Sequence, residues 1–137
     1  MNEDDPLPPE GAPAIRVIAM PADTNPNGDI FGGWLMSLMD SAAGSIAARH
    51  AHGRVVTIAV DSMTFHRPVV VGDEVSVYAK LVGVGRTSMK IDVQSWRRAR
   101  HDDRSYQVTH ATFTFVAIGE DRQTRRVPPL ANGEAAA

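Results

Sequence analysis

The 137-residue sequence contains no cysteine, which excludes disulfide bonds, thiol catalysis and cysteine-ligated metal sites. It also has little net charge, because 14 Lys and Arg nearly balance 16 Asp and Glu to give -2 at pH 7. A chain so close to neutral is not expected to bind nucleic acid or an anionic membrane through bulk charge. The G-x-S-x-G elbow, the Walker loop, the dinucleotide fingerprint and a basic-then-apolar leader are also missing. These absences predict a cytoplasmic protein that binds no nucleic acid.

The chain is organised around residues 25–49. This stretch opens with a polar turn in which Asn, Pro, Asn and Gly precede Asp29, a candidate helix N-cap or first-turn acid. The following residues, 34–48, carry the single charge Asp40, and their apolar side chains cover nearly every direction of a helical wheel. Such a helix is expected to be buried on all sides. It is shorter than the about 20 apolar residues that span a bilayer, so no membrane insertion is predicted.

The rest of the chain has the patterns of strands. Alternating or β-branched segments predict strands at residues 15–20, 54–65, 74–82, 87–97 and 105–118. The later strands are joined mainly by tight turns, which only an antiparallel sheet accommodates. The helix before them is expected to end at Gly53, because glycine is common just after a helix. The predicted fold is therefore α+β, with one curved antiparallel sheet wrapped around a central helix.

Composition divides the chain into one domain and two tails. At 137 residues with 43% hydrophobic residues, it is long enough to bury one real core. Residues 1–14 are acidic and Pro-rich and predict a disordered tail, residues 15–128 form the domain, and residues 129–137 predict a second tail. A single helix that is apolar on all sides leaves surface uncovered, which indicates self-association, most simply as a two-fold homodimer.

Two features of the helix are candidates for chemistry. Asp40 is either a paired structural acid or a general base or nucleophile whose pKa is tuned by apolar surroundings. Gly32 and Gly33 leave the helix start open, so that its amide groups can stabilise a developing negative charge, although glycines also simply permit tight packing. Gly33 and Asp40 lie seven residues, or about 10 Å, apart along a helix. One carbonyl cannot touch both, so they are expected to act together only across two chains.

Basic residues form the third candidate group. Arg54, Arg67 and Arg86, the last followed by Thr87 and Ser88, are candidates for holding a phosphate-bearing ligand or else are solvated surface residues. No acidic or cysteine partner at metal-ligand spacing follows the two histidines near the helix end, so no metal site is predicted.

Two runs of sequence, Asn-Gly-Asp-Ile-Phe-Gly-Gly-Trp at residues 27–34 and His-Gly-Arg-Val-Val-Thr at residues 52–57, are specific in combination. With Gly-Arg-Thr-Ser at residues 85–88 and further matches spread over residues 15–128, they resemble the bacterial YciA-like acyl-CoA thioesterases of the hotdog fold. The resemblance implies a homodimer that assembles into a hexamer, as a trimer of dimers. It also implies hydrolysis of acyl-CoA to a free carboxylic acid and CoA without metal or organic cofactor.

The resemblance also implies residue roles. The catalytic carboxylate falls on Asp40, and the turn and helix start shape the acyl-carbonyl pocket of the facing subunit through Asn27, Asp29, Gly32 and Gly33. The segments that handle CoA fall on Arg54, Val55, Val56, Thr57, Gly85, Arg86, Thr87 and Ser88. Two other functions stay open. A hotdog-fold dehydratase or hydratase needs a His beside its acid, and the nearest one, His50, lies at the far end of the helix. A non-catalytic acyl-CoA-binding module would tolerate loss of Asp40.

Overall fold

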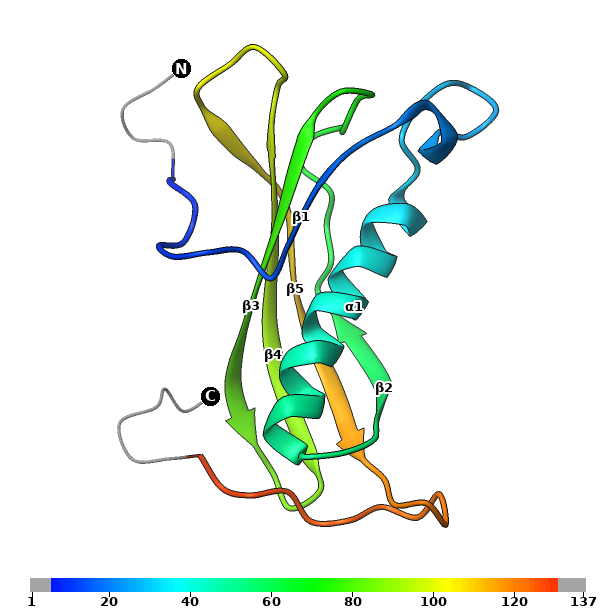
Figure 1. Ribbon diagram of the computed structural model, residues 1–137, viewed down its shortest axis with the longest axis vertical. Coiled ribbons are helices and arrows are strands. Elements are labelled where there is room, and N and C mark those ends of the chain that lie inside the picture. Colours follow the sequence, from blue (N-terminus) through cyan, green and yellow to red (C-terminus); the bar gives the residue numbers. More distant parts are fainter. Residues whose placement is uncertain (1–5, 131–137) are drawn as a thin grey trace.

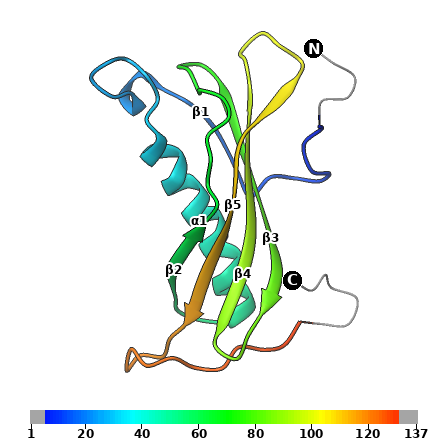
Figure 2. The same ribbon diagram turned by 180° about the vertical axis from the view of Figure 1, so that it is seen from behind.

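The structure, a computed structural model, describes residues 6–130, so residues 1–5 and 131–137 of the two predicted tails lie outside the described residues. Its elements in chain order are β1 (Ile15–Ile18), a 3-10 helix η1 (Pro21–Asp23), α1 (Gly32–Ala51), β2 (Val55–Asp61), β3 (Glu74–Val84), β4 (Ser88–Arg98) and β5 (Ser105–Ala117). The strands form one antiparallel sheet in the order β1-β3-β4-β5-β2. The sheet curls around α1, which lies along its concave face (Figures 1 and 2). The predicted α+β hotdog architecture is confirmed.

The core lies between one face of α1 and the central strands. Met89, Ile91 and Val93 of β4 alternate with more exposed residues and are fully buried, because successive side chains of a strand point to opposite faces of the sheet. Phe113 and Phe115 of β5 are buried beside them in register, because Ile91 pairs with Phe113 and Met89 with Phe115. The helix contributes residues three or four positions apart, which share one face. These are Leu35, Met39, Ala42, Ala43, Ala47 and Ala51.

The opposite face of α1 is exposed, so the prediction of a helix buried all round is wrong for the single chain. Met36 is 40% exposed, and Asp40 and Ser41 are exposed as well. The physical reason is that the sheet curls around only part of the helix. Small and apolar residues on the outer face of α1 are therefore left without a covering layer in the single chain.

The helix ends differ from the sequence predictions. Asp29 is neither N-cap nor first-turn acid, because α1 begins at Gly32 with Phe31 as its N-cap. Asp29 lies instead inside a closed turn, where its carbonyl accepts a 2.7 Å hydrogen bond from the Asn25 amide. At the other end, the left-handed residue that stops the helix is His52, with φ of 55°, and not Gly53.

Gly53 has a packing role. A Cβ at this position would lie 2.6 Å from a terminal guanidinium nitrogen of Arg125. Arg125 belongs to the segment after β5, which runs back beneath the end of α1 and the β3–β4 turn (Figure 1). A glycine next to the helix end therefore lets this segment approach closely.

Strand β2 is shorter than predicted and lies at an edge of the sheet. The predicted strand ran to residue 65, but β2 ends at Asp61, where Ser62 adopts a positive φ of 60°. A β-bulge interrupts its pairing with β5 between Thr57 and Ala59. Its other edge has no neighbouring strand among the described residues. Three apolar side chains of this edge strand are exposed by 38–57%: Val56, Ile58 and Val60.

Residues 6–14 carry no helix or strand and approach the other edge of the sheet. Ala14 donates its amide hydrogen to the Val77 carbonyl of β3 at 2.8 Å, which continues the pairing of β1 with β3. Within residues 6–130, no helix combines the length and apolarity that a membrane crossing requires.

Candidate active site

Asp40 lies near the middle of α1 and is held by a side chain from the neighbouring strand. The Thr57 hydroxyl on β2 donates a 2.6 Å hydrogen bond to Asp40 Oδ1. Both residues are exposed in the single chain, so the expectation of a carboxylate in apolar surroundings is wrong for one chain alone. The contact fixes one oxygen of the carboxylate and leaves the other available to a water molecule or a substrate.

The sequence signal for this contact was incomplete. Thr57 was predicted to belong to a CoA-handling segment, and the structure shows in addition that its hydroxyl contacts Asp40. Seventeen residues separate the two side chains in sequence, and only the packing of β2 against α1 brings them together. The CoA role predicted for Thr57 and for the apolar residues Val55 and Val56 stays a prediction.

The turn before α1 is organised by Asn25, a residue missing from the predicted site. The Asn25 side-chain oxygen accepts hydrogen bonds from the amides of Asn27 at 2.9 Å and Asp29 at 3.1 Å. Gly28 adopts a φ of +84°, which permits the tight reversal. An isolated bridge between Thr24 and Ile30 closes the turn at its base. The side chains of Asn27 and Asp29 are thereby presented on an exposed, ordered loop.

The start of α1 has backbone amide groups without partners inside the helix. Phe31 supplies no side-chain cap, and the first amide groups of a helix have no carbonyl partner within it. A Cβ on Gly32 would lie 3.3 Å from the Phe65 ring, so only glycine leaves this approach open without a shift of that ring. Gly33 and Asp40 share one exposed helix face, since seven residues make almost two full turns. At 1.5 Å per residue they lie about 10 Å apart along the axis of α1.

A cavity of about 270 Å³ adjoins this helix start. Its walls are largely apolar and include Phe31, Leu35, Phe65 and Val108, with Arg67 at the rim. Arg67 donates to the Gln107 carbonyl at 2.8 Å and lies 5.3 Å from the Tyr106 ring centroid. A space of this composition suits an apolar group of a ligand.

The other predicted CoA residues gather at the opposite end of α1. Strand β5 connects them, because the Ile118 amide donates to the Arg54 carbonyl at 3.0 Å and the Ala117 amide donates to the Thr87 carbonyl at 2.9 Å. The hairpin is closed by a 2.8 Å bond from the Gly85 amide to the Ser88 carbonyl. A Cβ at Gly85 would lie 2.6 Å from the Ser88 hydroxyl.

Arg54 and Arg86 therefore lie near one end of α1, whereas Arg67 lies near the other. The helix has 20 residues and is about 30 Å long. Within one chain these three arginines cannot share a phosphate, and the CoA role of Arg67 stays a prediction. Sequence reasoning missed a further basic pair at the Arg54 end, Arg125 and Arg126, although two adjacent arginines after the last strand were a visible signal.

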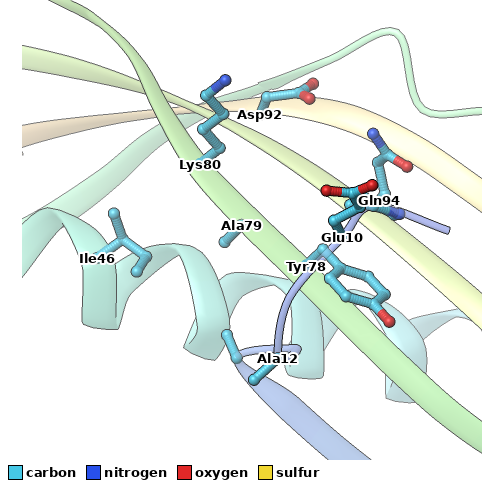
Figure 3. A pocket seen from close by; sticks show the side chains of 10 residues that line it. Glu10, Ala12, Ile46, Tyr78, Ala79, Lys80, Asp92 and Gln94 are labelled. Atoms are coloured by element: carbon cyan, nitrogen blue, oxygen red, sulfur yellow. The ribbon is translucent and has the colours of Figure 1, made fainter. Parts of the chain in front are cut away.

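A second cavity, of about 530 Å³, lies at the open edge of β3 beneath the N-terminal segment (Figure 3). Glu10, Tyr78, Lys80, Asp92 and Gln94 line it together with Ile46 of α1. None of the predicted catalytic or CoA residues belongs to its lining. Across residues 6–130, no group of three His, Asp or Glu side chains has an arrangement that holds a metal ion.

Comparison with known proteins gives the family. The sequence profile of the Thioesterase superfamily matches residues 27–102. An uncharacterized acyl-CoA thioester hydrolase of Zymomonas mobilis is 61% identical over 94% of this chain and 87% of its own length. The acyl-CoA thioester hydrolase YciA of Escherichia coli is 47% identical over 88% of this chain and 93% of its own.

A solved structure gives the same result at the level of the fold. The crystal structure of a hexameric broad-specificity acyl-coenzyme A thioesterase is 46% identical, covers 91% of this chain and 86% of its own, and superposes with a TM-score of 0.83. The profile match includes the Asn27–Gly33 turn, Asp40, Thr57 and the hairpin at residues 85–88. The chain belongs to the Thioesterase superfamily and is a relative of the YciA acyl-CoA thioester hydrolases.

Proposed function

We propose that this protein is an acyl-CoA thioester hydrolase that converts acyl-CoA and water into a free carboxylic acid and CoA. The observation that carries the proposal is the Asp40 carboxylate, held by Thr57 on an exposed face of α1 in a member of this superfamily. Relatives that this chain matches over most of their length are named acyl-CoA thioester hydrolases, which supports the same substrate class. A cytoplasmic location is part of this proposal.

The helix start and Asp40 have complementary tasks in the proposed mechanism. The thioester carbonyl oxygen lies against the amides near Gly32 and Gly33, where the helix dipole favours the negative charge of the tetrahedral intermediate. Asp40 either takes a proton from the attacking water or attacks the carbonyl itself to give a mixed anhydride that water then cleaves. In both routes the C–S bond breaks and the thiolate of CoA leaves, which demands no strong general acid.

The proposed active site needs two chains. Gly33 and Asp40 of one chain are too far apart to act on one carbonyl, so each site combines the helix start of one subunit with Asp40 of its partner. The exposed apolar side chains of β2 and its unpaired edge support a two-fold contact at this side of the sheet. The same contact would cover the outer face of α1 around Asp40. Assembly of three such dimers into a hexamer is supported by the hexameric relative.

Release of free thiol from acyl-CoAs tests the proposed function. The protein is incubated with saturated acyl-CoAs from two to sixteen carbons, and CoA is measured with a thiol reagent. We expect release from at least part of this series, with an apolar chain accommodated by the cavity next to Gly32. A dehydratase would instead change the absorbance of an enoyl or 3-hydroxyacyl thioester without thiol release. A binding module would show affinity without turnover, and either result would contradict the proposal.

Thr57 is expected to position the Asp40 carboxylate. Replacing it with Val removes the 2.6 Å hydrogen bond at nearly constant side-chain volume, and we expect kcat to fall about tenfold with little change in KM. Thr57→Ser keeps a hydroxyl and should restore most of the lost kcat. A Ser variant as slow as the Val variant would show that the hydroxyl does not orient the base, and a change in KM alone would show that Thr57 contacts CoA.

A further inference from the structure

The segment after β5, residues 119–130, returns across the end of the domain and binds to three elements. The Arg125 amide donates to the Ala117 carbonyl at 3.0 Å, and the Val127 amide donates to the Arg86 carbonyl of the β3–β4 turn at 2.9 Å. His50 near the end of α1 hydrogen-bonds through Nε2 to the Pro128 carbonyl at 2.7 Å. We call residues 119–130 the C-terminal strap. It runs beneath the β3–β4 turn and the last turn of α1 (Figures 1 and 2).

Side chains of the strap alternate between inside and outside. Arg125 is partly buried and donates from Nε to the Ile118 carbonyl at 3.2 Å, while Val127 is buried. Arg126 between them is exposed. Arg125 packs against Gly53 at the C-terminal end of α1, where a cation offsets the partial negative charge of the helix dipole. Arg125 is therefore engaged by the fold, and Arg126 is presented outward on a backbone fixed at both neighbouring residues.

Arg126 and Arg86 line the same cavity, whose volume is about 400 Å³. Its remaining walls come from the turn and the strap: Val84, Gly85, Val127, Pro129 and Leu130. Within residues 6–130, neither guanidinium forms an ion pair. Two unpaired arginines at one apolar-walled cavity form a pair of planar donors, the arrangement that matches phosphate oxygens.

We infer that Arg126 of the C-terminal strap acts with Arg86 to bind a phosphate group of the nucleotide part of CoA. The inference rests on the proposed function and adds a specificity for the carrier. An acyl-CoA substrate brings the phosphates of its nucleotide into this cavity, whereas an acyl-pantetheine contains no phosphate. The strap thereby makes the enzyme selective for CoA thioesters over thioesters that lack the nucleotide, and Arg126 is a residue of carrier specificity with no part in bond cleavage.

The test compares three substrates that share one acyl group: acyl-CoA, acyl-dephospho-CoA without the 3′-phosphate, and acyl-pantetheine without any nucleotide. Each is hydrolysed by the wild-type protein, by Arg126→Gln and by Arg122→Gln, which removes the same charge from the same strap outside the cavity lining. We expect Arg126→Gln to raise KM for acyl-CoA about tenfold with kcat nearly unchanged. Its KM for acyl-pantetheine should equal that of the wild type, and Arg122→Gln should behave as the wild type on all three substrates.

The acyl-dephospho-CoA arm identifies which phosphate is bound. If Arg126→Gln has no effect on this substrate, the 3′-phosphate is the ligand, and if the effect persists, the diphosphate is; both results support the inference. An unchanged KM for acyl-CoA, or an equal rise for acyl-pantetheine, would overturn it. Wild-type protein that hydrolyses none of the three substrates would overturn the proposed function itself, so the two failures are distinguishable. Arg126 is exposed and its neighbours are held by backbone bonds, so the variant is expected to fold.

Discussion

Replacing Asp40 with Asn is expected to lower kcat for acyl-CoA hydrolysis on the order of 10³-fold. The amide cannot accept a proton from water or attack the thioester, although it can still accept the hydrogen bond from Thr57. Asp40 is exposed and lies outside the buried core, so the substitution should leave the fold and the thermal unfolding temperature almost unchanged. A large loss of activity without loss of structure would assign the base or nucleophile to this side chain.

The measurement is thiol release under single-turnover and steady-state conditions, with circular dichroism on the same samples. Asp103→Asn is the matched control, because Asp103 is an exposed carboxylate in the loop between β4 and β5. It should retain wild-type rates. An Asp40→Asn protein that keeps more than about a tenth of wild-type kcat would show that the chemistry of proton transfer lies elsewhere.

The architecture was predictable because its local signals agree. The alternating pattern of β4 agrees with the burial of Met89, Ile91 and Val93. The lack of cysteine and of long apolar runs removed competing classes of fold. The ends of elements were less predictable. Asp29 has the residue type of a helix cap, but its backbone amide donates to the Asn25 side chain within the turn, and the helix begins only at Gly32. Local propensity alone does not decide between two such hydrogen-bonding arrangements.

The candidate site shows the same division between local and long-range information. Asp40 stood out as the only charge in an apolar segment, and the structure gives it a defined position. Its partner Thr57 was identified only as part of a different segment, because their contact depends on how β2 packs against α1. Gly53 illustrates the converse: a glycine at a helix end indicates a cap, yet here the left-handed residue is His52 and the glycine makes room for Arg125.

The proposal that each site contains residues from two chains makes a second strong prediction. Two inactive variants should restore activity when mixed, provided that each damages a different half of the site. In one, Asp40→Asn removes the carboxylate. In the other, Gly33→Val blocks the carbonyl position while its Cβ meets only the Phe31 ring at 3.4 Å, an ordinary contact. A dimer containing one chain of each kind has one site with both defects and one site with none.

Random pairing of equal amounts makes half of the dimers mixed, and each mixed dimer has one intact site of two, so activity should recover to about one quarter of wild type. The two variants are unfolded together, refolded, and assayed for thiol release. Mixing Asp40→Asn with Thr57→Val is the control, because both changes fall in the same half of the site and no intact site can form. That mixture should show only the average of its two components. If the Asp40→Asn and Gly33→Val mixture also stays at its average, the helix start and the carboxylate act within one chain, and the geometry along α1 then requires that only one of them contacts the thioester.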